Sequence, residues 1–435
     1  MNTPDGWNHI TLRQLLFRVT VKNRPELPLL SVVRDNGVIP RDYDKTENHN
    51  AIPKDLSDYL VIEPGQFVIN KMKAWQGSCA VSSYYGVVSP AYYVFNLRFE
   101  NKDFFHWAIR SRYYADCFAA LSIGIRVGQW DLPISKLRDV IFFSPPANEQ
   151  EQIVRWLGWQ TSRINKFIRA KRREIECLKE LKNAVISKAV TQGLNSNIEK
   201  EYSGVTWLGN IPKHWEVRYL SQIANEQSIK NRGLGEKNVL SLSYGNIIRK
   251  KDINFGLVPR DYDKYQIVNE GNIILRLTDL QNDHKSLRTG LVHELGIITS
   301  AYVCLNTTEN PEYIQTILHH YDLKKFFYGL GGGVRQSIGF QDIRYMKIPI
   351  PPKNEQEAIA AYLDDKCAAI DRLISKLTDE INLVLEYRTR IISDAVTGKI
   401  DLREAVVPDY EEEDELMSTY EEGDEIEEGD IDADD

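Results

Sequence analysis

Two long segments of the chain carry a narrow stripe of apolar residues on an otherwise charged background. No proline interrupts residues 148–192, and Gly158 is the only glycine there. Such a stripe is narrower than the apolar face of a helix buried in a globular core and is typical of a coiled-coil seam. We therefore expect two long helices that bury their stripes against each other. The seam residues are Ile153, Leu157, Ile164, Ile168, Ile175, Leu178, Val185 and Ala189, and then Ile359, Leu363, Ile370, Ile374, Leu377, Ile381, Leu385 and Ile392.

Proline and glycine mark the ends of both predicted helices. A Pro-Pro pair precedes each helix, at residues 145–146 and 351–352, and Gly193 and Gly398 follow them. Proline blocks helix upstream of these pairs, and glycine readily takes the left-handed conformation that ends a helix. A helix of 45 residues is about 65–70 Å long. Two such helices of matched length would hold other parts of the chain at a fixed separation.

The rest of the sequence has the pattern of a small α+β fold. Apolar and β-branched residues flank a glycine turn at Tyr59–Asn70 and at Gln266–Leu277, which predicts two pairs of strands joined by tight turns. Further strands are predicted at Pro90–Leu97 and Ser300–Leu305, and helices at Lys102–Leu121 and Pro311–Tyr328. The same order of elements thus occurs twice.

The chain is an internal duplication. Pro145–Ile153 (PPANEQEQI) matches Pro351–Ile359 (PPKNEQEAI) at an offset of 206 residues, and Val185–Thr191 matches Ile391–Thr397 at the same offset. Neither long helix therefore has an insertion relative to the other. Upstream the offset varies between 208 and 219 residues, as in Pro4–Trp7 with Pro212–Trp215, Gly37–Lys45 with Gly256–Lys264, and Gly86–Tyr92 with Gly296–Tyr302. Globular parts of variable length are thus joined to helices of matched length.

These patterns predict an α+β protein with two tandem α+β modules. Each module is followed by a long helix, and the two helices pair as an antiparallel coiled coil. The expected divisions are module 1 at residues 1–144, the first helix at 145–194, a polar linker with module 2 at 195–350, the second helix at 351–402, and an acidic, disordered tail at 403–435.

The charge is divided unevenly along the chain. The net charge is −8, but Asp409–Asp435 holds 16 acidic residues and no lysine or arginine. The remaining residues combine 54 basic with 46 acidic side chains, which gives that part a net charge of +8. The tail is either a solubility tail or a polyanion that competes with DNA for the basic part of the chain.

Several classes of protein are excluded by what the sequence lacks. No run of apolar residues is long enough to span a membrane, and the first residues carry no secretion signal. Five separated cysteines without C-x-x-C spacing indicate neither disulfides nor zinc, so we expect a cytoplasmic protein. Gly329–Gly333 lacks the spacing of a phosphate-binding loop, and no set of residues forms a recognisable catalytic or metal site. We expect a chain without catalysis or cofactor of its own.

Loops that follow the predicted strand pairs have the composition of nucleic-acid contacts. Arginine and lysine suit phosphate or guanine, and asparagine and glutamine suit adenine, although ordinary polar loops share this composition. The candidates in module 1 are Lys71, Lys73, Trp75 and Gln76, with Arg126, Gln129 and Trp130 on a later loop. The candidates in module 2 are Arg276, Thr278, Asp279, Gln281, Asn282, Lys285 and Arg288, with Arg335, Gln336 and Ser337 on a later loop.

The duplication helps to assign roles to these candidates. PRDYDK occurs in both copies, and Arg126 matches Arg335, whereas the other loop residues differ. If the two modules read different bases, the residues that they share cannot account for the difference in base preference. We therefore expect Arg41, Arg260, Arg126 and Arg335 to act as scaffold or phosphate contacts, and the divergent loops to read bases.

The combination of repeats resembles the specificity subunit of type I restriction–modification enzymes. The resemblance rests on the two P-P-x-N-E-Q-E-x-I segments, on Val185–Thr191, on Ile391–Leu402 and on Gly204–Leu220. It implies two target recognition domains that each read half of a bipartite site in double-stranded DNA. It also implies that the long helices set the spacer and dock two modification subunits, which bring S-adenosylmethionine and methylate adenine. Restriction subunits would add ATP- and magnesium-dependent translocation and cleavage.

Two alternatives remain open from the sequence alone. One is a coiled-coil scaffold that does not bind DNA. The other is a methyltransferase or nuclease fused to recognition domains, which the missing motifs disfavour: no N-P-P-[YF] or D-P-P-[YF] tetrapeptide is present.

Overall fold

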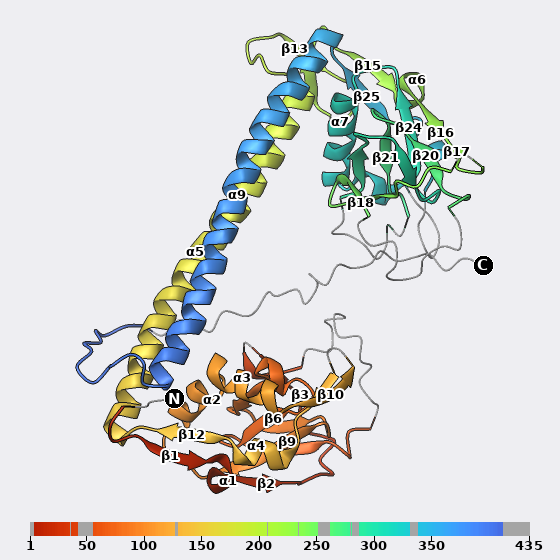
Figure 1. Cartoon of the computed structure of the whole chain (residues 1–435). Helices are drawn as coiled ribbons and strands as arrows, with labels where there is room; N and C mark the ends of the chain where they lie inside the picture. The colour runs from red at the N-terminus through yellow and green to blue at the C-terminus, as the bar shows by residue number, and fades with distance from the viewer. Residues whose placement is uncertain are drawn as a thin grey trace. The chain divides into compact units, whose positions relative to one another are not determined.

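Each half of the chain folds as an α+β module followed by one long helix (Figure 1). The structure, a computed structural model, describes residues 4–34, 36–41, 55–126, 129–206, 208–233, 235–250, 262–278, 280, 287–330 and 338–411. The long helices are α5, Ala147–Gln192, with 46 residues, and α9, Lys353–Val396, with 44 residues. These bounds confirm the two helices expected from the apolar stripes.

Module 1 consists of short strands around a few short helices. Its elements are β1 Asn8–Thr11, α1 Leu12–Leu15, β2 Leu16–Val19, β3 Leu30–Val33, β4 Gly37–Pro40, β5 Leu60–Ile62, β6 Phe67–Asn70, η1 Ala74–Gln76, β7 Cys79–Val81, β8 Gly86–Val88, β9 Tyr92–Leu97, α2 Lys102–Ile109, α3 Arg112–Leu121, β10 Ile123–Arg126, β11 Gln129–Asp131, α4 Ile134–Asp139 and β12 Ile141–Ser144.

Module 2 follows a hairpin made by the linker. The strands of this linker hairpin are β13 Lys200–Tyr202 and β14 Asn210–Pro212. The elements of module 2 are β15 Glu216–Tyr219, α6 Leu220–Ile223, β16 Ala224–Gln227, β17 Ile229–Lys230, β18 Leu240–Ser243, β19 Asn246–Arg249, β20 Gln266–Val268, β21 Ile273–Leu275, β22 Thr289–Leu291, β23 Gly296–Ile298, β24 Val303–Thr307, α7 Pro311–Leu323, η2 Phe326–Gly329, α8 Phe340–Ile343 and β25 Lys347–Ile350.

The two modules share one topology. The largest described sheet of module 1 has the order β2-β9-β6-β7, and that of module 2 has the matching order β16-β24-β21-β22. Each module also closes its first strand on its last, since β1 pairs with β12 and β15 pairs with β25, all antiparallel. The duplication seen in the sequence is therefore a duplication of fold.

The helix that covers each sheet differs between the copies. The helix expected at Lys102–Leu121 is two helices, α2 and α3, and the one expected at Pro311–Tyr328 is α7 followed by the turn η2. Both begin with an asparagine cap: the Asn101 side chain accepts a hydrogen bond from the Phe104 N–H at 2.9 Å, and Asn310 accepts one from the Tyr313 N–H at 2.8 Å. Such caps satisfy backbone donors that a helix start leaves unpaired.

The repeated P-P-x-N-E-Q motif joins each module to its long helix through a buried glutamine. The Gln150 amide donates to the Pro145 carbonyl at 2.8 Å, and the Gln356 amide donates to the Pro351 carbonyl at 2.9 Å. The Gln356 side chain also accepts a hydrogen bond from the Asn310 backbone N–H at 3.0 Å, at the start of α7. The motif therefore fixes where the long helix begins and ties it to the module before it.

Contacts divide the described chain into two units, and each unit holds one module with parts of both long helices. Unit 1 comprises residues 4–173 and 377–411, and unit 2 comprises residues 174–376. The same core of unit 1 contains Ile153 near the start of α5 and Val396 at the end of α9. The core of unit 2 contains Val190 near the end of α5 and Ile359 near the start of α9.

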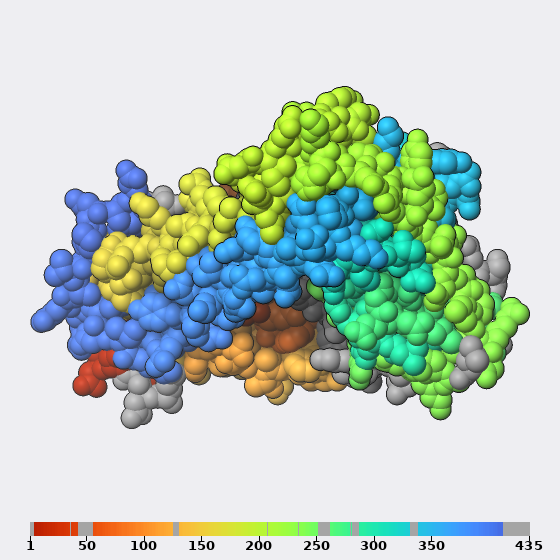
Figure 2. Space-filling model, turned by 90° about the horizontal axis from the view of Figure 1, so that it is seen from above, coloured from red at the N-terminus to blue at the C-terminus, as the bar shows by residue number. Residues whose placement is uncertain are grey.

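Ion pairs between the helices give their direction. In unit 1 the Lys171 ammonium lies 3.1 Å from the Glu380 carboxylate, and in unit 2 the Lys182 ammonium lies 2.7 Å from that of Asp371. Together with the cores, where Ile153 joins Val396 in unit 1 and Val190 joins Ile359 in unit 2, these pairs show that within each unit the partners on α9 move toward lower numbers as α5 advances. The helices are antiparallel, as expected, and Figure 2 shows α5 in yellow beside α9 in blue.

The glycine at each helix end lies beside a tryptophan from the other half of the sequence. Gly193 ends α5 with a φ of +71°, and Gly398 follows α9 with a φ of +72°. A Cβ at Gly193 would lie 3.2 Å from the Trp215 ring, and one at Gly398 would lie 3.1 Å from the Trp7 ring. Each helix therefore starts in its own module and ends against the other module, which explains the repeated P-x-x-W segments.

The first residues assigned to the tail lie against α5. The Arg155 guanidinium donates to the Val407 carbonyl at 3.2 Å, and the Gln152 amide donates to the Ala405 carbonyl. The Tyr410 side chain lies at Gly158, where a Cβ would clash with its hydroxyl. The tail expected at 403–435 thus begins as a segment packed on the helix, and residues 412–435 lie outside the described part of the chain.

A second pair of matched glycines, Gly86 and Gly296, is required by close packing rather than by a turn. A Cβ at Gly86 would lie 2.5 Å from the Pro28 carbonyl oxygen, and one at Gly296 would lie 2.7 Å from the Asn238 carbonyl oxygen. These carbonyls accept hydrogen bonds from the next residues, Val87 and Ile297, at 2.9 and 2.8 Å. The backbones meet where a side chain does not fit.

We expect Gly86→Ala to destabilise module 1 by about 1–3 kcal/mol, since the new methyl group meets backbone that has little room to move. Urea unfolding of the full chain measures the change. Gly329→Ala is the matched control, because a Cβ there meets nothing within 4 Å. Equal midpoints for the two variants would contradict the packing role of Gly86.

Candidate nucleic-acid interface

In module 1 the structure brings together the two loops that the sequence singles out. The Leu132 N–H donates to the Lys71 carbonyl at 3.1 Å, and the Lys71 ammonium lies 3.6 Å from the Asp131 carboxylate. The Trp75 and Trp130 rings lie 5.1 Å apart between centroids at an angle of 45°. The turn η1 and the hairpin β10–β11 therefore form one surface, although Trp75 and Trp130 are 55 positions apart in the chain.

Lys73 and Gln76 lie on the accessible part of this surface. The Lys73 side chain is exposed, and Gln76 is half-buried at the end of η1. Backbone hydrogen bonds hold the loop, including Gln76 N–H to the Lys73 carbonyl and Ser78 N–H to the same carbonyl at 3.1 and 3.3 Å. A loop fixed by its own backbone presents side chains in a defined arrangement, which base recognition requires.

Trp75 and Trp130 join the loops to each other. Both side chains are half-buried, and the Trp75 indole nitrogen is buried without an acceptor among the described residues. Aromatic pairs at this distance contribute about 0.5–1.5 kcal/mol beyond the area that they bury. Arg126 and Gln129 lie at the ends of β10 and β11, where they pair with each other in the backbone register.

Module 2 has the same junction between its two candidate loops. The Ile338 N–H donates to the Leu277 carbonyl at 3.0 Å, the bond equivalent to that between Leu132 and Lys71. Arg276 and Thr278 are half-buried beside this junction. Asp279, Gln281, Asn282 and Lys285, and also Arg335, Gln336 and Ser337, lie outside the described residues, as does Arg260.

Arg288 does not fit the predicted contact with DNA. Its side chain is 0% exposed. Its guanidinium donates to the carbonyls of Arg276 and Thr278 at 3.1 and 2.7 Å and to the Tyr328 hydroxyl at 3.1 Å. The sequence-based assignment failed because arginine on a polar loop is usually exposed. The structure places this arginine inside the neck of the loop.

Sequence reasoning missed the partners of these residues. Asp131 follows Trp130 directly and was not considered, while Asp322 and Tyr328 lie far from Arg288 in the chain. A local composition search does not find partners at such separations. One available signal was the change in offset, from 206 residues at Tyr59–Tyr265 to 210 at Gly86–Gly296, which locates an insertion of four residues in the second copy.

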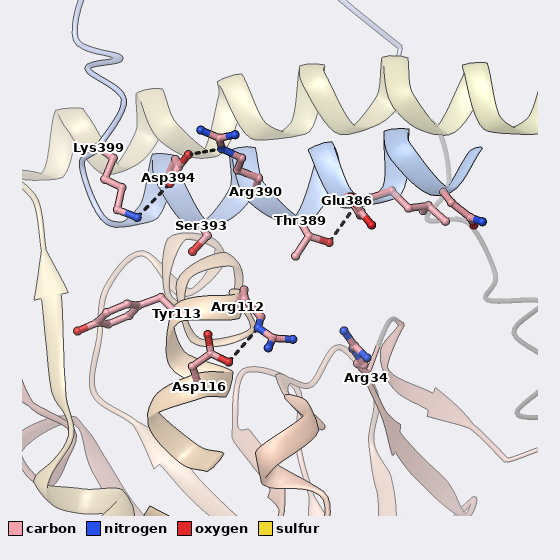
Figure 3. Close-up of a pocket in the computed structure, with 12 residues that line it drawn as sticks. Arg34, Arg112, Tyr113, Asp116, Glu386, Thr389, Arg390, Ser393, Asp394 and Lys399 are labelled. Atoms are coloured by element: carbon pink, nitrogen blue, oxygen red, sulfur yellow. Dashed lines mark hydrogen bonds and ion pairs between the residues drawn. The ribbon is translucent and has the colours of Figure 1, made fainter. Parts of the chain in front are cut away.

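A groove in unit 1, apart from these loops, has a volume of about 910 Å³. It lies between module 1, which supplies Arg34, Arg112 and Asp116, and α9, which supplies Glu386, Arg390 and Asp394 (Figure 3). The Arg112 guanidinium lies 2.9 Å from Asp116, and the Arg390 and Lys399 side chains lie 3.4 and 3.3 Å from Asp394. Because carboxylates of the groove hold these three cations, its attraction for phosphate is weak.

The corresponding cavity of unit 2 is smaller, about 520 Å³, and lies between α5 and α7. It is lined by Lys188 and Lys324 together with His320. Burial, with the nearby charge of Lys324, lowers the pKa of His320 to about 4, and burial lowers that of His319 to about 4. Both imidazoles are therefore neutral near pH 7 and serve as packing groups rather than as proton-transfer groups.

Neither a metal site nor a disulfide is found in the part of the chain that the structure describes. No group of three potential metal ligands occurs among these residues, and all five cysteines are free thiols. Burial raises the pKa of Cys79 and Cys304 to about 12, which makes both thiols unreactive. None of the described helices is both long and apolar enough to cross a membrane.

Comparisons with known proteins agree with the duplicated fold. A family model described as the type I restriction modification DNA specificity domain matches residues 212–383, which cover module 2 and much of α9. In Methanocaldococcus jannaschii, the protein assigned as the type I restriction enzyme MjaX specificity subunit is 24% identical over 73% of this chain and 69% of its own length. The MjaVIII specificity subunit of the same organism is 25% identical over 60% of this chain and 62% of its own length.

A solved structure shows the same fold over almost the whole chain. It comes from work on the complex assembly and conformational transition of the type I R-M system, and it has a TM-score of 0.64 at 13% identity. The alignment covers 92% of this chain and 100% of that chain. The duplicated modules and the antiparallel helices thus occur in a chain whose residues 212–383 match the DNA specificity domain of type I restriction–modification systems, and which is similar over much of its length to specificity subunits of such systems.

Proposed function

We propose that the chain reads a bipartite site in double-stranded DNA, one half with each module, and that its paired helices set the spacer and dock two adenine methyltransferase subunits. The observation that carries this proposal is the contrast between the two kinds of segment. The helices match in length without any insertion, while the loops at the two junctions differ in length and in sequence. Helices of matched length that carry modules with different loops suit two different half-sites at a fixed spacing.

The proposed reading surfaces are the two junctions described above. In module 1 they include Gln76 as a base contact and Lys73 as a phosphate contact, beside the Trp75–Trp130 pair, and in module 2 they include Arg276 and Thr278. Lysine and arginine suit phosphate or guanine, and glutamine suits adenine. Catalysis then belongs to partner subunits: S-adenosylmethionine to the modification subunits, and ATP and magnesium to restriction subunits where these are present.

Docking of two identical partners is supported by exposed apolar residues on the helices. In unit 1 these are Phe167, Leu383 and Tyr387, which are 40, 65 and 53% exposed. In unit 2 Leu373 and Leu181 are 50 and 51% exposed, and Cys177 is also exposed. Every member of one set has its counterpart in the other at the offset of 206 residues, so each unit carries an equivalent set.

Each set lies together on one outer face of the helix pair. Lys171 on α5 pairs with Glu380 on α9, and the helices are antiparallel. Phe167, four residues before Lys171, therefore lies at the same height along the helix pair as the residues about four after Glu380, which are near Leu383 and Tyr387. At about 100° per residue, these residues lie about 80° to 160° around each helix from the apolar seam, all toward the same flank. In an antiparallel pair that flank faces one side. We call these sets docking patch 1 (Phe167, Leu383, Tyr387) and docking patch 2 (Leu373, Cys177, Leu181).

The spacing role is tested by lengthening the helices. Seven residues inserted after Arg173 and after Lys376 add about 10 Å, which we expect to lengthen the unread spacer by about three base pairs. The measurement is selection of binding sites from random DNA with the complex of this chain and its modification subunits. Seven residues inserted in the polar linker after Asn197 form the control and leave the spacer unchanged. An unchanged spacer in the helix variant, or a site without two halves, contradicts the proposal.

The docking patches predict the stoichiometry of variants. We expect Leu383→Asp with Tyr387→Asp to lose the subunit at patch 1, and Leu181→Asp with Leu373→Asp to lose the one at patch 2. Each double variant then carries one modification subunit instead of two, as native mass spectrometry would show. Leu295→Asp is the control, because this leucine is 51% exposed on a hairpin of module 2. Retention of both subunits by both double variants excludes the patches as docking sites.

Lys73 predicts the salt dependence of binding. We expect Lys73→Ala to weaken binding to all sequences alike and to lower the slope of log K against log salt by about 1, because one phosphate contact is lost. Lys213→Ala serves as control, since Lys213 pairs with Glu199 at 3.2 Å in the linker hairpin. Titrations of the complex at several salt concentrations measure both. A slope equal to that of the wild type removes Lys73 from the interface.

A further inference from the structure

The loop between β21 and β22 is longer than its counterpart in module 1. Asn70 N–H donates to the Ser78 carbonyl in module 1, and Arg276 N–H donates to the Arg288 carbonyl in module 2, both at 2.9 Å. Arg288 therefore occupies the position of Ser78. Seven residues lie between the paired positions in module 1 and eleven in module 2, so the four-residue insertion falls within this loop.

The short loop of module 1 closes on itself. The turn η1 and its backbone hydrogen bonds occupy its length, and the Asn70 carboxamide accepts the Met72 N–H at 3.1 Å. At the position of Arg288, module 1 has the small side chain of Ser78, which is 3% exposed. A loop of this size needs no internal support beyond its own backbone.

In module 2 the two ends of this loop are joined by one buried side chain. Arg288 reaches back to the carbonyls of Arg276 and Thr278, at 3.1 and 2.7 Å, and its guanidinium carbon lies 5.2 Å from the centroid of the Tyr328 ring. The Arg288 backbone N–H donates to the Asp322 carboxylate at 2.7 Å. Asp322 is itself 2% exposed and lies near the end of α7. The strand end, the loop neck and the helix are thus joined at one arginine.

Burial of this guanidinium is costly unless its donors are satisfied. Neither leucine nor methionine in its place would pair with the two carbonyls, and the ammonium of lysine lacks the planar fork that serves the carbonyls and the tyrosine together. The geometry therefore suits arginine, and the residues that it holds, Arg276 and Thr278, are candidate readers of bases.

We infer that Arg288 is a positioning residue that sets base preference in the half-site of module 2 without contacting DNA. It acts by fixing the carbonyls of Arg276 and Thr278, and hence the directions in which those two residues leave the strand. The inference rests on the proposed function, because it assumes that module 2 reads one half of a bipartite site. It assigns to module 2 a support that module 1 lacks.

The test compares Arg288→Met, Arg288→Lys and Tyr328→Phe in the full complex with modification subunits. Selection from random DNA gives the base preference of each half-site, and titration gives the salt slope. Each correct base pair in a specific site is typically favoured by about 5- to 150-fold. We expect Arg288→Met to reduce this preference to near parity at one or more positions of the second half-site. The first half-site and the salt slope stay unchanged.

Two variants keep the test informative if Arg288→Met fails to fold. Arg288→Lys restores part of the preference, because an ammonium still reaches one carbonyl. Tyr328→Phe keeps the ring and removes only the hydroxyl that accepts the Nε–H, and it weakens the preference by a smaller factor. Ser78→Ala is the matched control in module 1 and leaves both half-sites as they are.

The outcomes separate this inference from the proposed function. An unchanged preference in the second half-site for Arg288→Met and Tyr328→Phe overturns the positioning role. A salt slope lowered by about 1 with base preference intact also overturns it, because that result indicates a phosphate contact. If the wild-type complex shows no bipartite preference at all, the proposed function fails instead.

Discussion

The fold depends on an antiparallel pairing in which each long helix starts in one module and ends against the other. The start is fixed by a buried glutamine, Gln150 or Gln356, that donates to the carbonyl of the preceding Pro-Pro pair. The end is fixed by a left-handed glycine beside a tryptophan of the other half, Gly193 with Trp215 and Gly398 with Trp7. Because both ends are anchored, a residue inserted in one helix alone would shift the seam or pull one end from its module. This constraint explains why the helices keep one offset while the modules do not.

Much of this architecture could be predicted from the sequence because it rests on local chemistry. The apolar stripes, the proline pairs and the glycines fix the helices to within a few residues, and the repeats reveal the duplication. The bond between Asn310 and Gln356 could not be predicted, since it joins α7 to α9 across 46 residues and involves side chains that are common on surfaces. The break of one expected helix into α2 and α3 was missed for a similar reason: Arg110 and Ser111 do not by themselves interrupt a helix.

The position of the candidate loops was predictable, but the packing of their residues was not. Loops after strand pairs are exposed and rich in polar groups, so composition locates them. Composition does not distinguish Lys73, which is exposed, from Arg288, which is buried completely. The difference in burial depends on how many hydrogen-bond acceptors the fold places around each side chain. For Arg288 those acceptors come from the opposite end of its own loop and from Tyr328, 40 residues away.

The duplication also distinguishes segments that are alike in the two halves from segments that differ between them. Docking patches 1 and 2 lie on segments without insertions and keep an apolar or sulfur-containing side chain at each matched position, as expected of two sites for one kind of subunit. The junction loops differ in length and in support, since module 1 uses a short turn with a tryptophan pair and module 2 uses a buried arginine. A four-residue insertion in a loop leaves the anchors at its strand ends in place, as the matched hydrogen bonds at Asn70 and Arg276 show. Under the proposed function, base preference can therefore change in one module while the spacing and the partner surfaces stay the same, because the residues proposed for each role are held by different contacts.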